Sequence, residues 1–116
     1  MTTVPLTLRS CSSLALVLAS LSLAACNPCV ERCRVESRNI ESCLDDWNLD
    51  WGQLGASSAK DFKEQCIATE RLWIDSLSGE DRAAEQDACW ELTTALRSAD
   101  DCDERWAALS GYGDAS

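Results

Sequence analysis

From residue 28 onward, apolar positions recur every three or four residues, which is the repeat of helices that each bury one seam. The first seam consists of Val30, Cys33, Ser37, Ile40, Leu44, Trp47 and Trp51. Asn27 and Pro28 predict the start of this helix, because asparagine caps helices and proline suits the first helical position. Gly52 and Gly55 predict its end.

Two further seams follow. Ser58 and Asp61 have the spacing of a capping box and predict the start of a second helix, which Ser78 and Gly79 end. Its seam consists of Phe62, Cys66, Thr69, Trp73 and Ser76. The third seam opens near Glu80 and consists of Ala88, Leu92, Ala95, Ala99, Cys102, Trp106 and Leu109.

The third seam is compatible with one helix or with two. It meets no proline or glycine before Gly111, so one long helix is possible, but Ser98 and Asp101 form another capping pattern that would split off a fourth helix. No segment has the alternation of a strand. The sequence therefore predicts an all-α fold, a small disulfide-stapled bundle of three or four helices.

The first 25 residues have the three parts of a secretory signal peptide. Arg9 is their one charged residue, residues 11–23 are apolar or small, and Ala24 and Ala25 are small residues at a cleavage position. As a helix, residues 10–25 would extend roughly 24 Å, which is shorter than the ~30 Å hydrocarbon core of a bilayer. We therefore expect a cleaved signal peptide over 1–25 rather than a permanent transmembrane anchor.

The end of this segment, Leu23-Ala24-Ala25-Cys26, resembles the lipobox of bacterial lipoproteins. The resemblance covers the signal peptide and these four positions. It implies cleavage before Cys26, a thioether-linked diacylglycerol on Cys26 and an acylated new amino terminus, and two or three acyl chains anchor a protein stably. Asn27 after this cysteine favours the outer membrane, by resemblance to the sorting pattern of enteric bacteria. The alternative is an ordinary secretory cut after Ala24.

The cysteine count agrees with lipidation. The chain has eight cysteines. If Cys11 leaves with the signal peptide and Cys26 carries lipid, an even set of six remains for three disulfides: Cys29, Cys33, Cys43, Cys66, Cys89 and Cys102. Disulfides in a small domain imply an oxidising compartment.

The sequence does not determine which cysteines pair. Cys66 and Cys89 lie nearly symmetrically about the turn at 77–79, which makes them the favoured pair. Cys29 and Cys33 share one helical face, and we expect them to reach two different partners. The mature domain is expected over 26–116, with a short frayed tail from about residue 111.

Charge excludes one class of partner. The net charge of −10 falls to about −11 when Arg9 leaves with the signal peptide, so nucleic acid is not expected as a partner. Arg32, Arg34 and Arg38 form a local basic cluster beside Cys26, and we expect them to face anionic lipid head groups. Residues 100–104 form an acidic segment that we expect to face solvent.

Catalytic and metal-binding patterns are weak. The chain has no histidine and no nucleophile or phosphate-binding motif, so we do not expect an enzyme or a cofactor. Residues 46–52 begin like a calcium loop, but Trp51 stands where that loop needs glycine and Ser57 where it needs glutamate, so no metal site is expected. The five tryptophans either fill the core or stack on glycans.

The resulting hypothesis is a lipid-anchored, disulfide-rich helical binding or structural module of a bacterial cell envelope. It would lie in the cell membrane or outer membrane through its covalent lipid, facing an oxidising compartment, with an envelope protein or a glycan as partner. The first alternative is an unanchored secreted effector or inhibitor. An enzyme or redox protein is the third.

Overall fold

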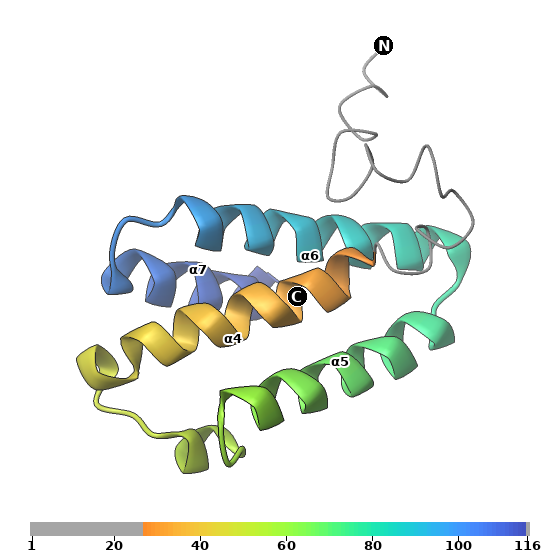
Figure 1. Cartoon of the computed structure of the whole chain (residues 1–116). Coiled ribbons are helices and arrows are strands. Elements are labelled where there is room, and N and C mark those ends of the chain that lie inside the picture. Colours follow the sequence, from red (N-terminus) through yellow and green to blue (C-terminus); the bar gives the residue numbers. More distant parts are fainter. Residues whose placement is uncertain (1–26, 116) are drawn as a thin grey trace, which may run out of the picture.

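The computed structural model describes residues 27–115, which form an all-α bundle, as predicted. The elements are α4 (Pro28–Trp47), a short 3-10 helix η1 (Trp51–Leu54), α5 (Ala59–Ser76), α6 (Gly79–Ser98) and α7 (Cys102–Ala115). Successive α-helices run antiparallel, and α4 lies between α5 on one side and α6 and α7 on the other (Figure 1). This described part of the chain contains no strand.

The start of α4 is confirmed where the sequence predicted it. The Asn27 side chain accepts a hydrogen bond from the Cys29 N–H at 2.8 Å, and Pro28 occupies the first helical turn, where a missing N–H costs nothing. The helix therefore begins two residues after Cys26, which itself lies outside the described residues.

The end of α4 comes earlier than predicted. Asn48 adopts the left-handed conformation (φ 58°, ψ 41°) and its N–H donates to the carbonyl groups of Leu44 and Asp45, which ends the helix at Trp47. The chain then forms η1, whose Asp50 cap precedes Trp51, and Gly55 ends η1 with φ 79°. The predicted extension of α4 to Gly52 was wrong because asparagine, and not only glycine, tolerates this conformation.

The third seam is split into two helices. α6 ends at Ser98, and α7 starts after Asp101, whose carboxylate accepts from the Glu104 N–H at 2.9 Å. The Glu104 carboxylate in turn accepts from the Asp100 N–H at 2.8 Å. The break is therefore at the predicted place, but Asp101 caps the new helix instead of Ser98. α7 extends to Ala115, beyond Gly111 where the helix was expected to end.

Three disulfides join α4 to each of the other three α-helices. Cys29 bonds to Cys89 of α6, Cys33 to Cys66 of α5, and Cys43 to Cys102 of α7. At 3.6 residues per turn, positions 29, 33 and 43 fall within an arc of about 80° around α4. The six cysteines therefore form three bridges, as predicted, and α4 is the central helix of the bundle.

The favoured pair of the sequence analysis, Cys66 with Cys89, was wrong. Cys66 bonds to Cys33 and Cys89 bonds to Cys29, so the two neighbours on α4 reach two different helices, as expected. The reason is spatial: α4 lies between α5 and α6 along most of their length (Figure 1), so cysteines on α5 and α6 meet α4 before they meet each other.

The apolar core is small and partly made of sulfur. One cluster contains Cys29, Ile74 and Cys89, with Leu77 packed against it. The other contains Val35, Leu92 and Leu96, with Ala108 and Leu109 packed against it. Four cysteines are among the fully buried residues, so the disulfides fill space that larger apolar side chains fill in other bundles.

We predict that the disulfides differ in resistance to a hydrophilic reductant under native conditions. Cys29 and Cys89 are both 0% exposed, whereas Cys66 and Cys102 are partly exposed. Cys29–Cys89 should therefore be reduced last, because the attacking thiolate must reach a sulfur. Partial reduction followed by alkylation and peptide mass analysis measures the order. Loss of all three bonds at one rate would contradict this prediction, since it would mean that reduction requires global unfolding.

Candidate functional site

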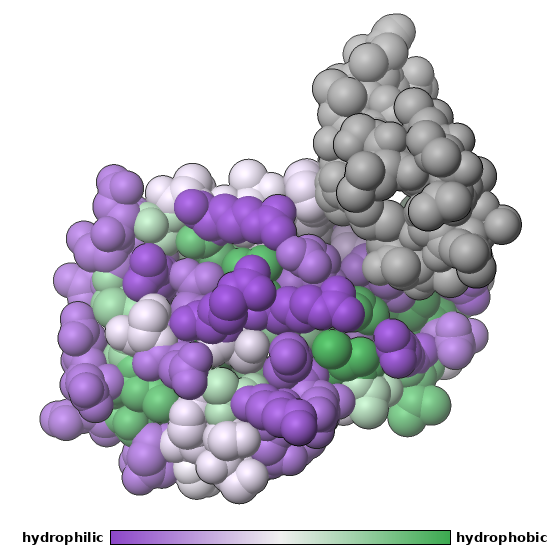
Figure 2. All heavy atoms as spheres, viewed as in Figure 1, coloured by the Kyte–Doolittle hydropathy of each residue, from purple (hydrophilic) through white to green (hydrophobic). Residues whose placement is uncertain are grey.

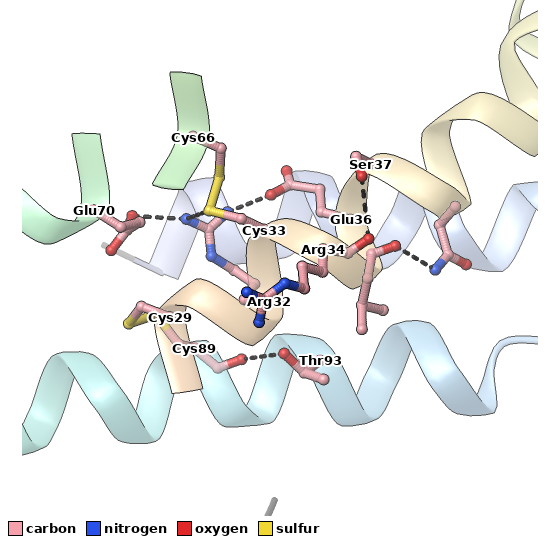
Figure 3. Close-up of polar contacts among 12 residues, drawn as sticks. Cys29, Arg32, Cys33, Arg34, Glu36, Ser37, Cys66, Glu70, Cys89 and Thr93 are labelled. Atoms are coloured by element: carbon pink, nitrogen blue, oxygen red, sulfur yellow. Dashed lines mark hydrogen bonds and ion pairs between the residues drawn. A yellow bond between two sulfur atoms is a disulfide. The ribbon is translucent and has the colours of Figure 1, made fainter. Parts of the chain in front are cut away.

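Arg32 does not lie on the surface with the other arginines. Its side chain is buried between α4 and α5, where it forms ion pairs with Glu36 and, at 2.6 Å, with Glu70 of α5 (Figure 3). The same guanidinium lies 3.8 Å from the Cys33 sulfur. The expectation that Arg32 faces lipid head groups is therefore wrong, because position 32 lies on the side of α4 that packs against α5.

Arg34 and Arg38 do lie at the surface. Arg34 is half-exposed and lies 3.6 Å from the Glu31 carboxylate, which also pairs with Arg97 of α6 at 2.6 Å. Arg38 is exposed. Hydrophilic side chains predominate along α4 on this face of the molecule (Figure 2). Two of the three arginines predicted to face lipid therefore lie at the surface of α4.

The buried carboxylates around Arg32 titrate unusually. Burial raises the pKa of Glu36 above its ordinary value of 4.5; the Arg32 charge opposes this, and the Glu70 charge adds to it. Burial also raises the pKa of Glu70, again against the effect of Arg32, and the Glu85 charge adds to it. The contact between α4 and α5 therefore buries two carboxyl groups, Glu36 and Glu70, around a single guanidinium, that of Arg32.

Two of these acids lie beside the Cys29–Cys89 disulfide. Carboxylate oxygens of Glu70 and Glu85 and the sulfurs of both cysteines lie within 4.8 Å of one another. Because the sulfurs are bonded to each other, they are not thiolates and do not offer the ligands that a metal would need. Cys26 and Cys29 have Cys-x-x-Cys spacing, but the bond to Cys89 occupies Cys29.

Three tryptophans, at positions 47, 51 and 106, have described contacts within the protein. Trp47 donates its indole N–H to the Cys102 carbonyl at 3.1 Å and contacts Trp106 edge-on, with ring centroids 5.2 Å apart. Trp51 lies 5.6 Å from the Phe62 ring. These contacts tie the end of α4 to α7 and η1 to α5, although Trp106 remains 50% exposed.

An open, mostly apolar groove runs along α6, which we call the α6 groove. Its cavity volume is about 640 Å³. The lining is formed by α5 and the α5–α6 turn (Trp73, Leu77), α6 (Asp81, Ala84, Glu85, Ala88, Glu91, Leu92, Ala95) and α7 (Ala108, Gly111). Three acids and no basic residue line it.

α6 carries two different seams. Asp81, Ala84, Ala88, Glu91 and Ala95 follow steps of three and four and form the floor and rim of the groove. Cys89 and the leucines at 92 and 96 are buried on the neighbouring face. The three-four repeat places Ala88, Leu92 and Ala95 in one seam, so the groove was not predicted from the sequence. The signal that would separate them is residue size: the apolar groove positions of α6 are alanines apart from Leu92, which is buried and also lines the groove, whereas Cys89 and Leu96 lie in the core alone.

Comparison with known proteins identifies no relative. No protein-family model matches the sequence, and neither the curated proteins nor the solved structures contain a significant match. Among the described residues, every helix is too short or too polar to cross a bilayer.

We predict that Arg32→Met is strongly destabilising and Arg34→Met is not. Removing the Arg32 guanidinium leaves Glu36 and Glu70 buried without their cation, and breaking a buried ion pair in this way typically costs about 3–5 kcal/mol. The half-exposed Arg34 pair is worth about 0–1 kcal/mol. Denaturant unfolding followed by circular dichroism measures both.

A third variant tests the cause. Changing Arg32 to Met together with Glu36→Leu and Glu70→Leu removes all three charges, and should recover much of the stability that Arg32→Met alone loses. If the triple variant were no more stable than the single one, lost packing rather than unpaired charge would explain the effect of Arg32→Met.

We predict that stability rises on mild acidification from neutral pH. The native pKa of Glu36 and of Glu70 lies above the ordinary 4.5, so in this window the native state holds protons that the unfolded state has lost. The unfolding free energy therefore falls as pH rises from about 4.5 through the raised native pKa values. Glu36→Gln with Glu70→Gln should flatten this dependence, whereas Glu41→Gln on the exposed side of α4 should leave it unchanged. An unchanged slope in the double variant would contradict the assignment.

Proposed function

We propose that the chain is a lipid-anchored, disulfide-rich helical binding module of a bacterial cell envelope, without enzymatic activity. The observation that carries its binding role is the α6 groove, whose walls come from three helices that are each bonded to α4. The lipobox resemblance of Leu23 to Cys26 supports the anchor. The three disulfides support an oxidising compartment outside the cytoplasm.

The groove suits binding because it is formed before any partner arrives. Its volume of about 640 Å³ lies within the usual range for binding pockets, roughly 300–1,000 Å³, and its lining is mostly apolar with a few polar groups. Disulfides limit the movement of α5, α6 and α7 relative to α4, so little conformational entropy is lost when a partner binds. The three disulfides therefore favour a rigid binding surface.

The anchor would hold this domain close to the bilayer. α4 begins at Pro28, two residues after Cys26, so the chain between lipid and domain is too short to act as a flexible tether. α4 starts at the end of the bundle where α5 connects to α6, and the acidic α6–α7 connection lies at the opposite end (Figure 1). In this arrangement residues 100–104 point away from the lipid. Arg34 and Arg38 lie roughly 9 Å and 15 Å along α4 from its start, so Arg34 is the nearer of the two to anionic head groups.

The principal alternative is an unanchored secreted effector or inhibitor with the same fold and the same groove. The two functions differ in the covalent state of Cys26, which intact mass reports directly. An enzyme comes third, because the groove offers carboxylates but the chain has no histidine to act with them.

We expect Cys26→Ser to abolish lipid attachment and to leave uncut precursor, because lipid transfer needs the thiol of that residue. A matched control is Cys29→Ser combined with Cys89→Ser, which also removes a nearby cysteine but leaves no unpaired thiol. Labelling of cells with a fatty-acid analogue and intact mass of the extracted protein measure both. Equal labelling of wild type and Cys26→Ser would exclude the anchor and favour the secreted alternative.

A further inference from the structure

From the α6 groove we infer the chemical class of its partner: an amphipathic helix that carries basic residues on its apolar face, supplied by another envelope protein. This inference rests on the proposed binding role. It uses three properties of the groove, which are its length, the size of its floor residues and the charge of its rim.

The groove has the length of a helix segment. Asp81 and Ala95, the first and last lining residues of α6, lie 14 positions apart, roughly 21 Å at 1.5 Å per residue. They repeat in steps of three and four, so they present a straight stripe rather than a closed pocket. A helix of about four turns lying along α6 matches this stripe, whereas a compact small molecule would contact only part of it.

The floor lets a second backbone come close. Ala84, Ala88 and Ala95 are small, and Ala84 and Ala95 are exposed. Helix axes separate by about 8 Å where such small residues meet, and by about 10 Å where large ones do. Trp73, which is half-exposed, and Leu77 form an apolar wall at one end, and Ala108 of α7 contributes on the other side. These residues provide contacts for apolar side chains of the incoming helix.

The rim determines the charge of the partner. Asp81 and Glu91 lie ten residues apart on the same stripe, roughly 15 Å along the helix, and Glu85 lies between them. Because no basic side chain lines the groove, a helix without cations would cover the exposed Glu91 carboxylate with no charge to pair with it, whereas the Asp81 carboxylate keeps the hydrogen bond that it accepts from the Ser78 hydroxyl at 3.2 Å. Lysine or arginine at two seam positions ten or eleven residues apart on the partner would pair with Asp81 and Glu91.

The same charges disfavour a second copy of this chain. Each copy carries a net charge of about −11 once the signal peptide is removed, and self-association through the groove would bring two acidic stripes together. A basic partner relieves this repulsion, and attraction would also speed its association at low ionic strength.

The experiment titrates the full-length protein, expressed with its own signal and purified in detergent, against a labelled helical peptide of about five turns. The peptide has apolar residues in a three-four repeat and lysines at two seam positions ten residues apart; a second peptide has glutamates at those two positions. We expect saturable binding of the lysine peptide, weakening as salt rises, and at least tenfold weaker binding of the glutamate peptide.

Groove variants locate the binding. Ala84→Trp and Ala95→Trp fill the groove and should each weaken the lysine peptide at least tenfold, whereas Ala83→Trp, on an exposed neighbour outside the lining, should not. Asp81→Asn with Glu91→Gln should weaken binding about threefold to tenfold and reduce its salt dependence. Glu41→Gln with Asp45→Asn on α4 removes the same charge and serves as its control. Circular dichroism verifies that each variant is folded.

Three results would overturn the inference: no binding of either peptide, equal binding of both, or equal effects of tryptophan at 83 and 84. Concentration-dependent dimerisation that Ala84→Trp abolishes would assign the groove to a second copy instead. Intact mass of the same samples reports the lipid separately. Peptide binding without lipid would therefore overturn the anchor and leave this inference standing, and lipid without peptide binding would do the reverse.

Discussion

The arrangement of the whole domain depends on one strip of α4. Three cysteines within an arc of about 80° each bond to a different helix, so α5, α6 and α7 all take their positions from α4. The bonds close segments of 60, 33 and 59 residues, and loop entropy alone assigns roughly 4 kcal/mol to each. In a domain of this size, with two small apolar clusters, that contribution is comparable with the whole stability of a typical domain.

The covalent frame also explains how the interior tolerates Arg32. The guanidinium and its two carboxylates lie on α4 and α5 beside the Cys33–Cys66 bond, which fixes these helices against each other. A buried ion pair is a weak source of stability because both charges lose water, and the raised pKa of Glu36 and Glu70 reflects that cost. The disulfide holds the helices together while the ion pairs satisfy charges that the helix contact has buried.

The sequence predicts features that depend on residue spacing or on the number of cysteines. It does not predict features that depend on which helices lie side by side. The all-α class, the Asn27 and Ser58 caps, the break near residue 100 and the number of disulfides follow from spacing and parity. The pairing of Cys66 depends on which helix packs beside α5, and the spacing of the cysteines in the sequence does not indicate this. Arg32 and Arg34 are close in sequence but point about 160° apart around α4, so a basic cluster in sequence is divided between core and surface. The part played by Cys26 lies outside the described residues and remains a proposal.

The α6 groove was not predicted because α6 has two adjacent apolar faces. One packs in the core and the other lines the groove. Its cysteine and leucines pack against α4 and α7, while its alanines and acids form a stripe about a quarter of a turn or more further round. Alanine is compatible with both a tight core and an open surface, so periodicity alone does not separate the two. The bond from Cys89 to α4 leaves the second face open, because it holds α6 from the core side only. A partner on that face would add a helix to the bundle without displacing any disulfide, and the acidic rim would select that helix by charge.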